Sequence, residues 1–222
     1  MRALLSDVKV SGWFTLKSLQ ELIDGGSWTM YIHRMVRTQL YFDVETHRRL
    51  RERHPNLLTI IAPRHPERGT AIRDMLAARR LTVAQRSRGE PLVREIDIYL
   101  ADTLGELGLF YRAAPIAFLG GSLVPHGGQN PIEPTRLDAS VLHGPHVHNF
   151  AAVYDRLDAA VPVAPISDAA TLAAAVGGLL ADPRLRAARA AAAIAALAPL
   201  SGALDATMQA LRPYLVGAYA AP

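Results

Sequence analysis

A glycine-rich segment, GGSLVPHGGQNPIEP over residues 120–134, holds the densest set of residues suited to binding chemistry. Two glycine pairs in one loop are costly unless the backbone needs unusual angles or a ligand approaches it closely. Asn130 stands where a helix N-cap is expected. Glu133 follows three residues later, where it could accept from two sugar hydroxyls or complete a capping box. The segment has neither the P-loop pattern nor the dinucleotide fingerprint, so it predicts a binding loop of another kind.

A second motif places an arginine just beyond a continuous apolar run. Residues 57–62 read LLTIIA, as expected of a strand buried on both faces, and Arg64 follows in the motif PRHP. A guanidinium at that point can fork onto a phosphate. The alternative is a solvated loop arginine, and the spacing alone does not separate the two.

A third motif, DTLGELG, covers residues 102–108. Asp102 and Thr103 offer an N-cap for a helix over 104–112. Gly105 would then let a ligand approach the first turn, where free N–H groups favour anions. Glu106 could accept from a base or a sugar, or simply favour the helix start. Simple capping explains this motif as well as ligand binding does.

Strand-like and helix-like patterns alternate at short spacing from residue 45 onward. This alternation predicts an α/β fold with a Rossmann-like parallel sheet flanked by helices. The expected strands are 57–62, 81–84, 96–100, 116–119, 140–142 and 161–164. The expected helices are 45–53, one ending near residue 80, 104–112, a short one from 131, 149–157 and most of 168–215. Ligands bind outside the carboxyl ends of such strands, so the loops after Ala62, Leu100, Leu119 and Leu142 should form the site.

The two ends of the chain differ in pattern. Residues 1–44 show no clear organisation and stay unassigned, so we expect the Rossmann-like domain to cover residues 45–222. The tail is helical and alanine-rich, with Asp182 and Pro183 as a helix start. Two apolar stripes on it predict core faces: Leu172, Val176, Leu179 and Leu180, then Leu204, Met208, Leu211 and Leu215.

The composition excludes several classes of protein. With 222 residues and no cysteine, the chain is no disulfide scaffold, thiolate metal site or cysteine enzyme. No apolar run approaches the roughly 20 residues of a membrane-spanning helix. The start lacks the apolar core of a signal peptide, so we expect a soluble, intracellular chain. The net charge is +4, and the excess of basic residues lies in the first hundred residues, but no aromatic–basic interleaving supports nucleic-acid binding.

Two other groups of residues suggest chemistry at first glance. His143, His146 and His148 are closely spaced, yet no carboxylate or cysteine is placed to complete a tetrahedral site, so we expect no metal. Ser122 lies in Gly-Gly-Ser-Leu rather than Gly-x-Ser-x-Gly, which argues against a hydrolase nucleophile.

Taken in order, PRHPER, DTLGELG, FLGGSLVPHGGQNPIEP and HGPHVHNF resemble motifs of the 3-deoxy-D-manno-octulosonic acid (Kdo) transferases. The segment SRGEPL over residues 87–92 also has a counterpart there. The likeness covers residues 45–215 and concerns the C-terminal, donor-binding half of those enzymes. It implies one half of a glycosyltransferase-B (GT-B) fold. It also implies an inverting, metal-independent transfer of Kdo from CMP-Kdo to a lipid A precursor, during lipopolysaccharide assembly at the cytoplasmic face of the inner membrane.

The resemblance also assigns residues to the donor. It implies CMP contacts at Pro63 and Arg64, at Leu104, Gly105 and Glu106, and at Asn130, Pro131, Ile132 and Glu133. The loop at Gly121 and Ser122 is expected to border the Kdo carboxylate or phosphate. No cofactor or metal is implied, and the partners are CMP-Kdo and the lipid A precursor.

Residues 1–44 depart from the family. Its members have an N-terminal acceptor domain with the catalytic carboxylate base and a membrane anchor, and residues 1–44 resemble neither. We therefore expect no catalytic residue in this chain, no membrane contact of its own, and no transfer by the chain alone. Two alternatives stay open: a catalytically inactive nucleotide-binding module, and an epimerase-like sugar-nucleotide protein of the same fold.

Overall fold

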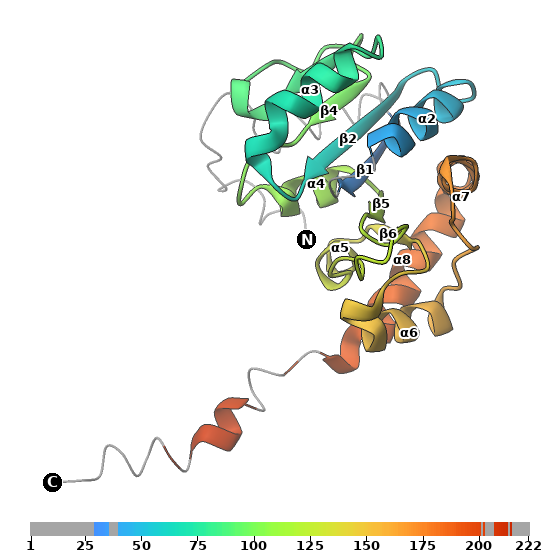
Figure 1. Cartoon of the computed structure of the whole chain (residues 1–222). Coiled ribbons are helices and arrows are strands. Elements are labelled where there is room, and N and C mark those ends of the chain that lie inside the picture. The colour runs from blue at the N-terminus through green and yellow to red at the C-terminus, as the bar shows by residue number, and fades with distance from the viewer. Residues whose placement is uncertain (1–28, 36–39, 201, 203–206, 213, 215–222) are drawn as a thin grey trace, which may run out of the picture.

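The computed structural model describes residues 29–35, 40–200, 202, 207–212 and 214. Six parallel strands form one sheet in the order β3-β4-β2-β1-β5-β6 (Figure 1). The strands are β1 (Thr29–Met35), β2 (Leu57–Pro63), β3 (Val83–Gln85), β4 (Ile98–Leu100), β5 (Ile116–Leu119) and β6 (Ser140–His143).

Helices connect the strands and cover both faces of the sheet. They are α2 (Leu40–Arg51), α3 (Gly69–Ala77), α4 (Leu107–Ala113), α5 (Ile132–Arg136), α6 (Ala151–Ala160), α7 (Ala169–Ala181) and α8 (Pro183–Leu197). Short 3-10 turns lie at Pro66–Arg68, Arg86–Arg88, His148–Phe150 and Ala198–Leu200. α8 starts as expected, because the side chain of Asp182 accepts from the backbone of Leu185 and Pro183 takes the first helical position.

The apolar run of β2 is buried at all seven positions, as its composition predicts. Leu57 and Ile61 pack with the apolar faces of α2, α3 and α7. Leu58 and Ile60 point the other way and pack with residues of α4 and α6. This alternation is the period of two that a strand buried on both faces requires. The fold class expected from the sequence is therefore confirmed.

The sheet extends to the N-terminal side of the boundary expected at residue 45. β1 lies between β2 and β5, and Ile32 pairs with Ile60 of β2 and Ala117 of β5. α2 also begins earlier than expected, at Leu40. The segment of β1 escaped the sequence pattern because His33 and Arg34 interrupt its apolar residues. Residues 1–28 and 36–39 lie outside the described part of the chain.

Two further expectations were wrong. Residues 161–164 form no strand; they are the irregular connection between α6 and α7. Met208 and Leu211 of the second tail stripe are 50% and 44% exposed rather than buried. The helical turn that carries them extends away from the sheet, so it has no core to face (Figure 1). Leu204 and Leu215 lie outside the described residues. The first stripe is confirmed, because Leu172, Val176 and Leu179 are buried.

Candidate functional site

Two of the three motifs meet in one pocket at the carboxyl edge of the sheet. β2 and β4 are neighbouring parallel strands, so the loops that follow them emerge side by side. A pocket of about 210 Å³ lies between these loops. Its lining includes Pro63, Arg64 and Pro66 from the first loop, and Thr103, Leu104 and Gly105 from the second. The pocket thus brings together residues that are about 40 positions apart in the sequence. This agrees with the rule that ligand sites form at the carboxyl edge of a parallel sheet.

The groups at the mouth of this pocket are free to meet a ligand. Arg64 is exposed, and its guanidinium makes no hydrogen bond or ion pair with any described residue. Leu104 is 82% exposed, although it is a large apolar residue. A free guanidinium beside an exposed apolar side chain suits a ligand that has both an anionic group and a flat apolar face.

The start of α4 differs from the expected one. The helix begins at Leu107 rather than Leu104, so Gly105 precedes its first turn. Gly105 has a φ of +81°, and nothing lies within 4 Å of the position that a Cβ would take. The glycine is therefore required by the left-handed backbone and not by the lack of space. The expected placement of Gly105 in the first helical turn was wrong, because Leu104 and Gly105 form an exposed turn before the helix.

Asp102 does not cap α4 either. It is buried, and its carboxylate accepts from the Ser87 backbone N–H (2.9 Å), the Ser87 hydroxyl (2.7 Å) and the Gln85 amide (2.6 Å). A Cβ on Gly69 would come within 2.0 Å of an Asp102 oxygen, so only glycine fits at the start of α3. These contacts join residues that are distant in the sequence, so a local capping pattern cannot reveal them.

Glu106 is held by an arginine that the motifs did not include. Arg86 donates to both carboxylate oxygens of Glu106, at 2.9 Å from Nε and 2.7 Å from Nη2, and Thr103 donates to the same carboxylate. The hydrogen bond from Arg86 holds the pKa of Glu106 below its usual range, although burial opposes the shift. Both oxygens are thus engaged inside the protein. Arg86 directly precedes SRGEPL, and the only available signal was that neighbourhood.

The third motif, residues 120–134, follows β5 and therefore also lies at the carboxyl edge of the sheet. Asn130 accepts from the Ile132 backbone N–H at 2.9 Å, so its side chain supports the start of α5, whose N-cap position is Pro131. Glu133 is exposed, and no described residue forms a hydrogen bond or ion pair with it, so the capping box is not formed. One of its oxygens lies 3.5 Å from the Cβ position of Gly108 in α4. Glu133 therefore lies close to the second motif, with its carboxylate available.

The glycine-rich loop between β5 and α5 has a constrained backbone. Gly121, Gly127 and Gly128 all have left-handed φ values, of +74°, +97° and +74°. Ser122 is fully buried; its hydroxyl donates to the Leu119 carbonyl and accepts from the Gly144 backbone. The Ser122 hydroxyl is thus engaged within the fold, which agrees with the expectation that it is no hydrolase nucleophile.

The far end of this loop rests on two aromatic rings. Tyr154 is buried and donates to the Gln129 carbonyl at 2.7 Å, and burial raises the pKa of its hydroxyl far above the usual value. His143 packs on Tyr154 with ring centroids 4.5 Å apart, and its Nε2 lies 2.9 Å from Asp158. His143 is thus engaged in supporting the loop.

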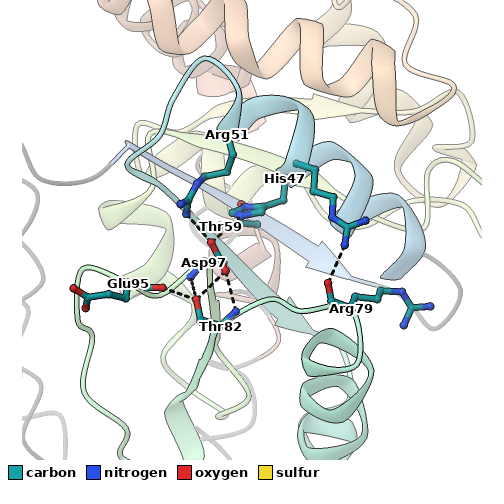
Figure 2. Close-up of polar contacts among 8 residues, drawn as sticks. His47, Arg51, Thr59, Arg79, Thr82, Glu95 and Asp97 are labelled. Atoms are coloured by element: carbon teal, nitrogen blue, oxygen red, sulfur yellow. Dashed lines mark hydrogen bonds and ion pairs between the residues drawn. The ribbon is translucent and has the colours of Figure 1, made fainter.

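A second polar cluster lies at the amino ends of the same strands (Figure 2). Asp97 precedes β4 and accepts from the backbone and hydroxyl of Thr82, while Arg51 of α2 contacts it at 2.6 Å. His47 of α2 lies 3.6 Å from the same carboxylate and bonds Thr59 of β2 at 2.8 Å. Burial alone would raise the pKa of Asp97, but His47 and Thr82 outweigh it and hold that pKa far below its usual range.

Among the described residues, no group of three histidine, aspartate or glutamate side chains is arranged to hold a metal ion. Within the same residues, no helix is both long and apolar enough to cross a membrane.

No protein-family model matches the chain. It is 36% identical over 173 residues to the 3-deoxy-D-manno-octulosonic acid transferase of Haemophilus influenzae, which covers 78% of this chain and 40% of that protein. It is 39% identical over 163 residues to the transferase of the same name from Bordetella pertussis, which covers 72% of this chain and 38% of that protein. The chain thus spans about two fifths of the length of these curated relatives.

Among solved structures, the C-terminal CMP-Kdo binding domain of WaaA from Acinetobacter baumannii is similar to this chain with a TM-score of 0.75 and 27% identity. The match covers 82% of this chain and 97% of that domain. In sequence and in fold, the chain matches the C-terminal half of the Kdo transferases.

Proposed function

We propose that the chain binds CMP-Kdo and supplies the donor-nucleotide site for transfer of Kdo to a lipid A precursor in lipopolysaccharide synthesis. The observation that carries this proposal is the meeting of two separate motifs in one pocket with a free arginine, with Glu133 of the third motif beside the second one. The similarity to a domain named for CMP-Kdo binding supports the same ligand.

The chemistry of the exposed groups suggests how the nucleotide is held. The Arg64 guanidinium binds the phosphate, because it is exposed and unpaired within the described residues. The Glu133 carboxylate accepts from ribose hydroxyls. Pro63, Leu104, Gly105 and Glu106 on one side and Asn130, Pro131 and Ile132 on the other complete the CMP contacts. The loop at Gly121 and Ser122 borders the Kdo carboxylate or phosphate through its backbone.

The transfer step needs a base that the pocket does not hold. In an inverting transfer, an acceptor hydroxyl attacks the anomeric carbon of Kdo while the bond to the CMP phosphate breaks and CMP leaves. A base must take the proton of that hydroxyl. No aspartate, glutamate or histidine lines the pocket, and the free carboxylate beside it, Glu133, is assigned to the ribose hydroxyls. We therefore propose that the base comes from a separate acceptor half. The proposed transfer uses no metal or cofactor and takes place at the cytoplasmic face of the bacterial inner membrane.

The absence of a base from the pocket lining also favours a second candidate, a CMP-binding module without catalysis. Complementation separates the two. The purified chain should not transfer Kdo from CMP-Kdo to a lipid A precursor by itself, but should do so when the acceptor half of a Kdo transferase is added as a separate polypeptide. CMP binding with no transfer in the mixture would favour the module. Transfer by the chain alone would contradict the assignment of the base.

A further inference from the structure

An ion pair lies beneath the exposed turn that borders the pocket. The side chains of Arg86 and Glu106 are only 8% and 15% exposed, and two hydrogen bonds join them in a bidentate fork. Arg86 follows β3, whereas Glu106 belongs to the loop after β4. The pair thus joins two neighbouring loops at the carboxyl edge of the sheet, and one of these loops contributes to the pocket lining.

A second connection joins the same loops. The Asp102 carboxylate accepts from Ser87 and Gln85, so both carboxylates of the 102–106 loop are held by residues 85–87. The residues between those carboxylates, 103–105, include the exposed Leu104 and the left-handed Gly105. Residues 85–87 thus hold the carboxylates on both sides of the turn, although none of them lines the pocket.

The pair is built to stay charged. The hydrogen bond to Glu106 raises the pKa of Arg86, against the effect of its burial. Tyr99 lies beside the pair, and burial raises the pKa of its hydroxyl to about 12, so it stays neutral. Removing one partner would leave a buried charge without compensation, and the remaining side chain would have to move toward water. Such a movement would displace the turn.

We propose that Arg86 is a positioning residue, which holds Glu106 and with it the turn 103–105 in the place where that turn meets the nucleotide. The link to the nucleotide rests on the function proposed above. Arg86 itself does not touch the ligand, because Glu106 occupies its fork. The position of the turn is a property of the ligand-free chain, so it can be tested separately from binding.

A control ion pair lies at the opposite edge of the sheet, where the Arg51 side chain is 36% exposed against 8% for Arg86. Arg51 pairs with Asp97 at 2.6 Å and joins α2 to the amino end of β4. Arg51→Gln removes an ion pair at the amino edge of the same sheet, and neither partner lines the pocket. Any effect of Arg86→Gln that arises only from lower global stability should also appear in Arg51→Gln.

The experiment compares Arg86→Gln, Arg86→Lys, Glu106→Gln and the double Arg86→Gln/Glu106→Gln variant with Arg51→Gln and the unaltered chain. The first readout is amide hydrogen exchange of residues 103–107 without ligand. The second is CMP affinity by calorimetry, under conditions where circular dichroism reports every variant as folded. The lysine variant keeps the charge but loses the fork, which guards against a glutamine variant that fails to fold.

We expect faster exchange at 103–107 in Arg86→Gln but not in Arg51→Gln. CMP affinity should fall roughly tenfold in Arg86→Gln and less in Arg86→Lys, and the double variant should be no worse than either single one. Unchanged exchange, or equal losses in Arg51→Gln, would overturn the positioning role. If the unaltered chain binds no CMP, the proposed function fails; the exchange data still confirm or overturn the positioning of the turn.

Discussion

The amino edge and the carboxyl edge of the sheet carry similar polar side chains but pair them differently. At the amino edge, Asp97 gathers Thr82, Arg51 and His47 into a cluster whose members mainly contact one another (Figure 2). At the carboxyl edge, buried pairs such as Arg86–Glu106 lie beneath groups that stay exposed and unpaired among the described residues, Arg64 among them.

This contrast separates stability from binding. An edge whose charges satisfy one another contributes to folding and offers nothing to a ligand. An edge that keeps a free guanidinium and a free carboxylate gives up pairing energy and gains a site. Substitutions at the amino edge should therefore change the free energy of unfolding, and those at the carboxyl rim should change CMP affinity.

The largest effect is expected from Asp97→Asn. The change removes the charge that Arg51 faces and places an amide where Thr82 donates, so we expect a loss of about 3 kcal/mol in the free energy of unfolding. CMP affinity should stay unchanged. Urea unfolding with calorimetry on the same samples checks both. A marked loss of affinity in a folded variant would break the division between the edges.

The depressed pKa of Asp97 also predicts that the stability of the chain depends on pH. The folded-state pKa of Asp97 is depressed, so its stabilisation is complete above its unfolded pKa of about 3.9 and is lost as the pH falls below that value. The stability of the unaltered chain should drop more steeply below pH about 4 than that of Asp97→Asn. Parallel curves in urea unfolding at graded pH would assign the acid sensitivity to other carboxylates.

The second largest effect on the free energy of unfolding is expected from Gly69→Ala. Its Cβ would come within 2.0 Å of the buried Asp102 carboxylate, which three hydrogen bonds hold in place. We expect a loss of about 2 kcal/mol from overpacking, measured by thermal unfolding. Gly178→Ala is the control, because nothing lies near its Cβ position in α7 and the change should stabilise the helix slightly. Equal behaviour of the two variants would refute the close approach at Gly69.

Glu133→Ala tests the carboxyl rim. Loss of the partner for a sugar hydroxyl should weaken CMP binding by about 1–3 kcal/mol and leave stability nearly unchanged, because Glu133 is exposed. Glu52→Ala, which removes an exposed carboxylate in the turn after α2, should change neither quantity. Full affinity in Glu133→Ala would remove this residue from the site.

The smallest effect is expected from Arg64→Lys. Lysine keeps the charge but cannot fork onto a phosphate, so CMP affinity should fall by about 1 kcal/mol. Arg53→Lys in the turn after α2 serves as the control for a change of exposed arginine. Calorimetry at several salt concentrations checks this; unchanged affinity at all of them would mean that Arg64 is not the phosphate clamp.

Local patterns predicted the parts of the fold that depend on local order. β5 has the expected bounds, Ile116–Leu119, because an apolar run of this length between turns is too short for a helix and is typical of a buried strand. The meeting of Arg64 with Leu104 and Gly105 followed from the rule for parallel sheets. The functional roles of these residues stay predictions.

Contacts between distant residues were beyond such patterns. The partner of Glu106 is 20 positions away, and Asp102 favours Ser87 and Gln85 over the helix that it precedes in sequence. β1 was missed because pairing with both neighbours, rather than its own composition, makes it a strand. The exposed Met208 shows the converse, an apolar stripe for which the described chain provides no partner.

A calorimetric titration of CMP into the purified chain, with UMP and AMP as controls, tests the central claim most directly. The account predicts saturable binding of CMP that is clearly tighter than that of either control. Failure of a folded chain to bind CMP, or equal binding of all three nucleotides, would contradict the assignment of the carboxyl edge as a CMP-Kdo site.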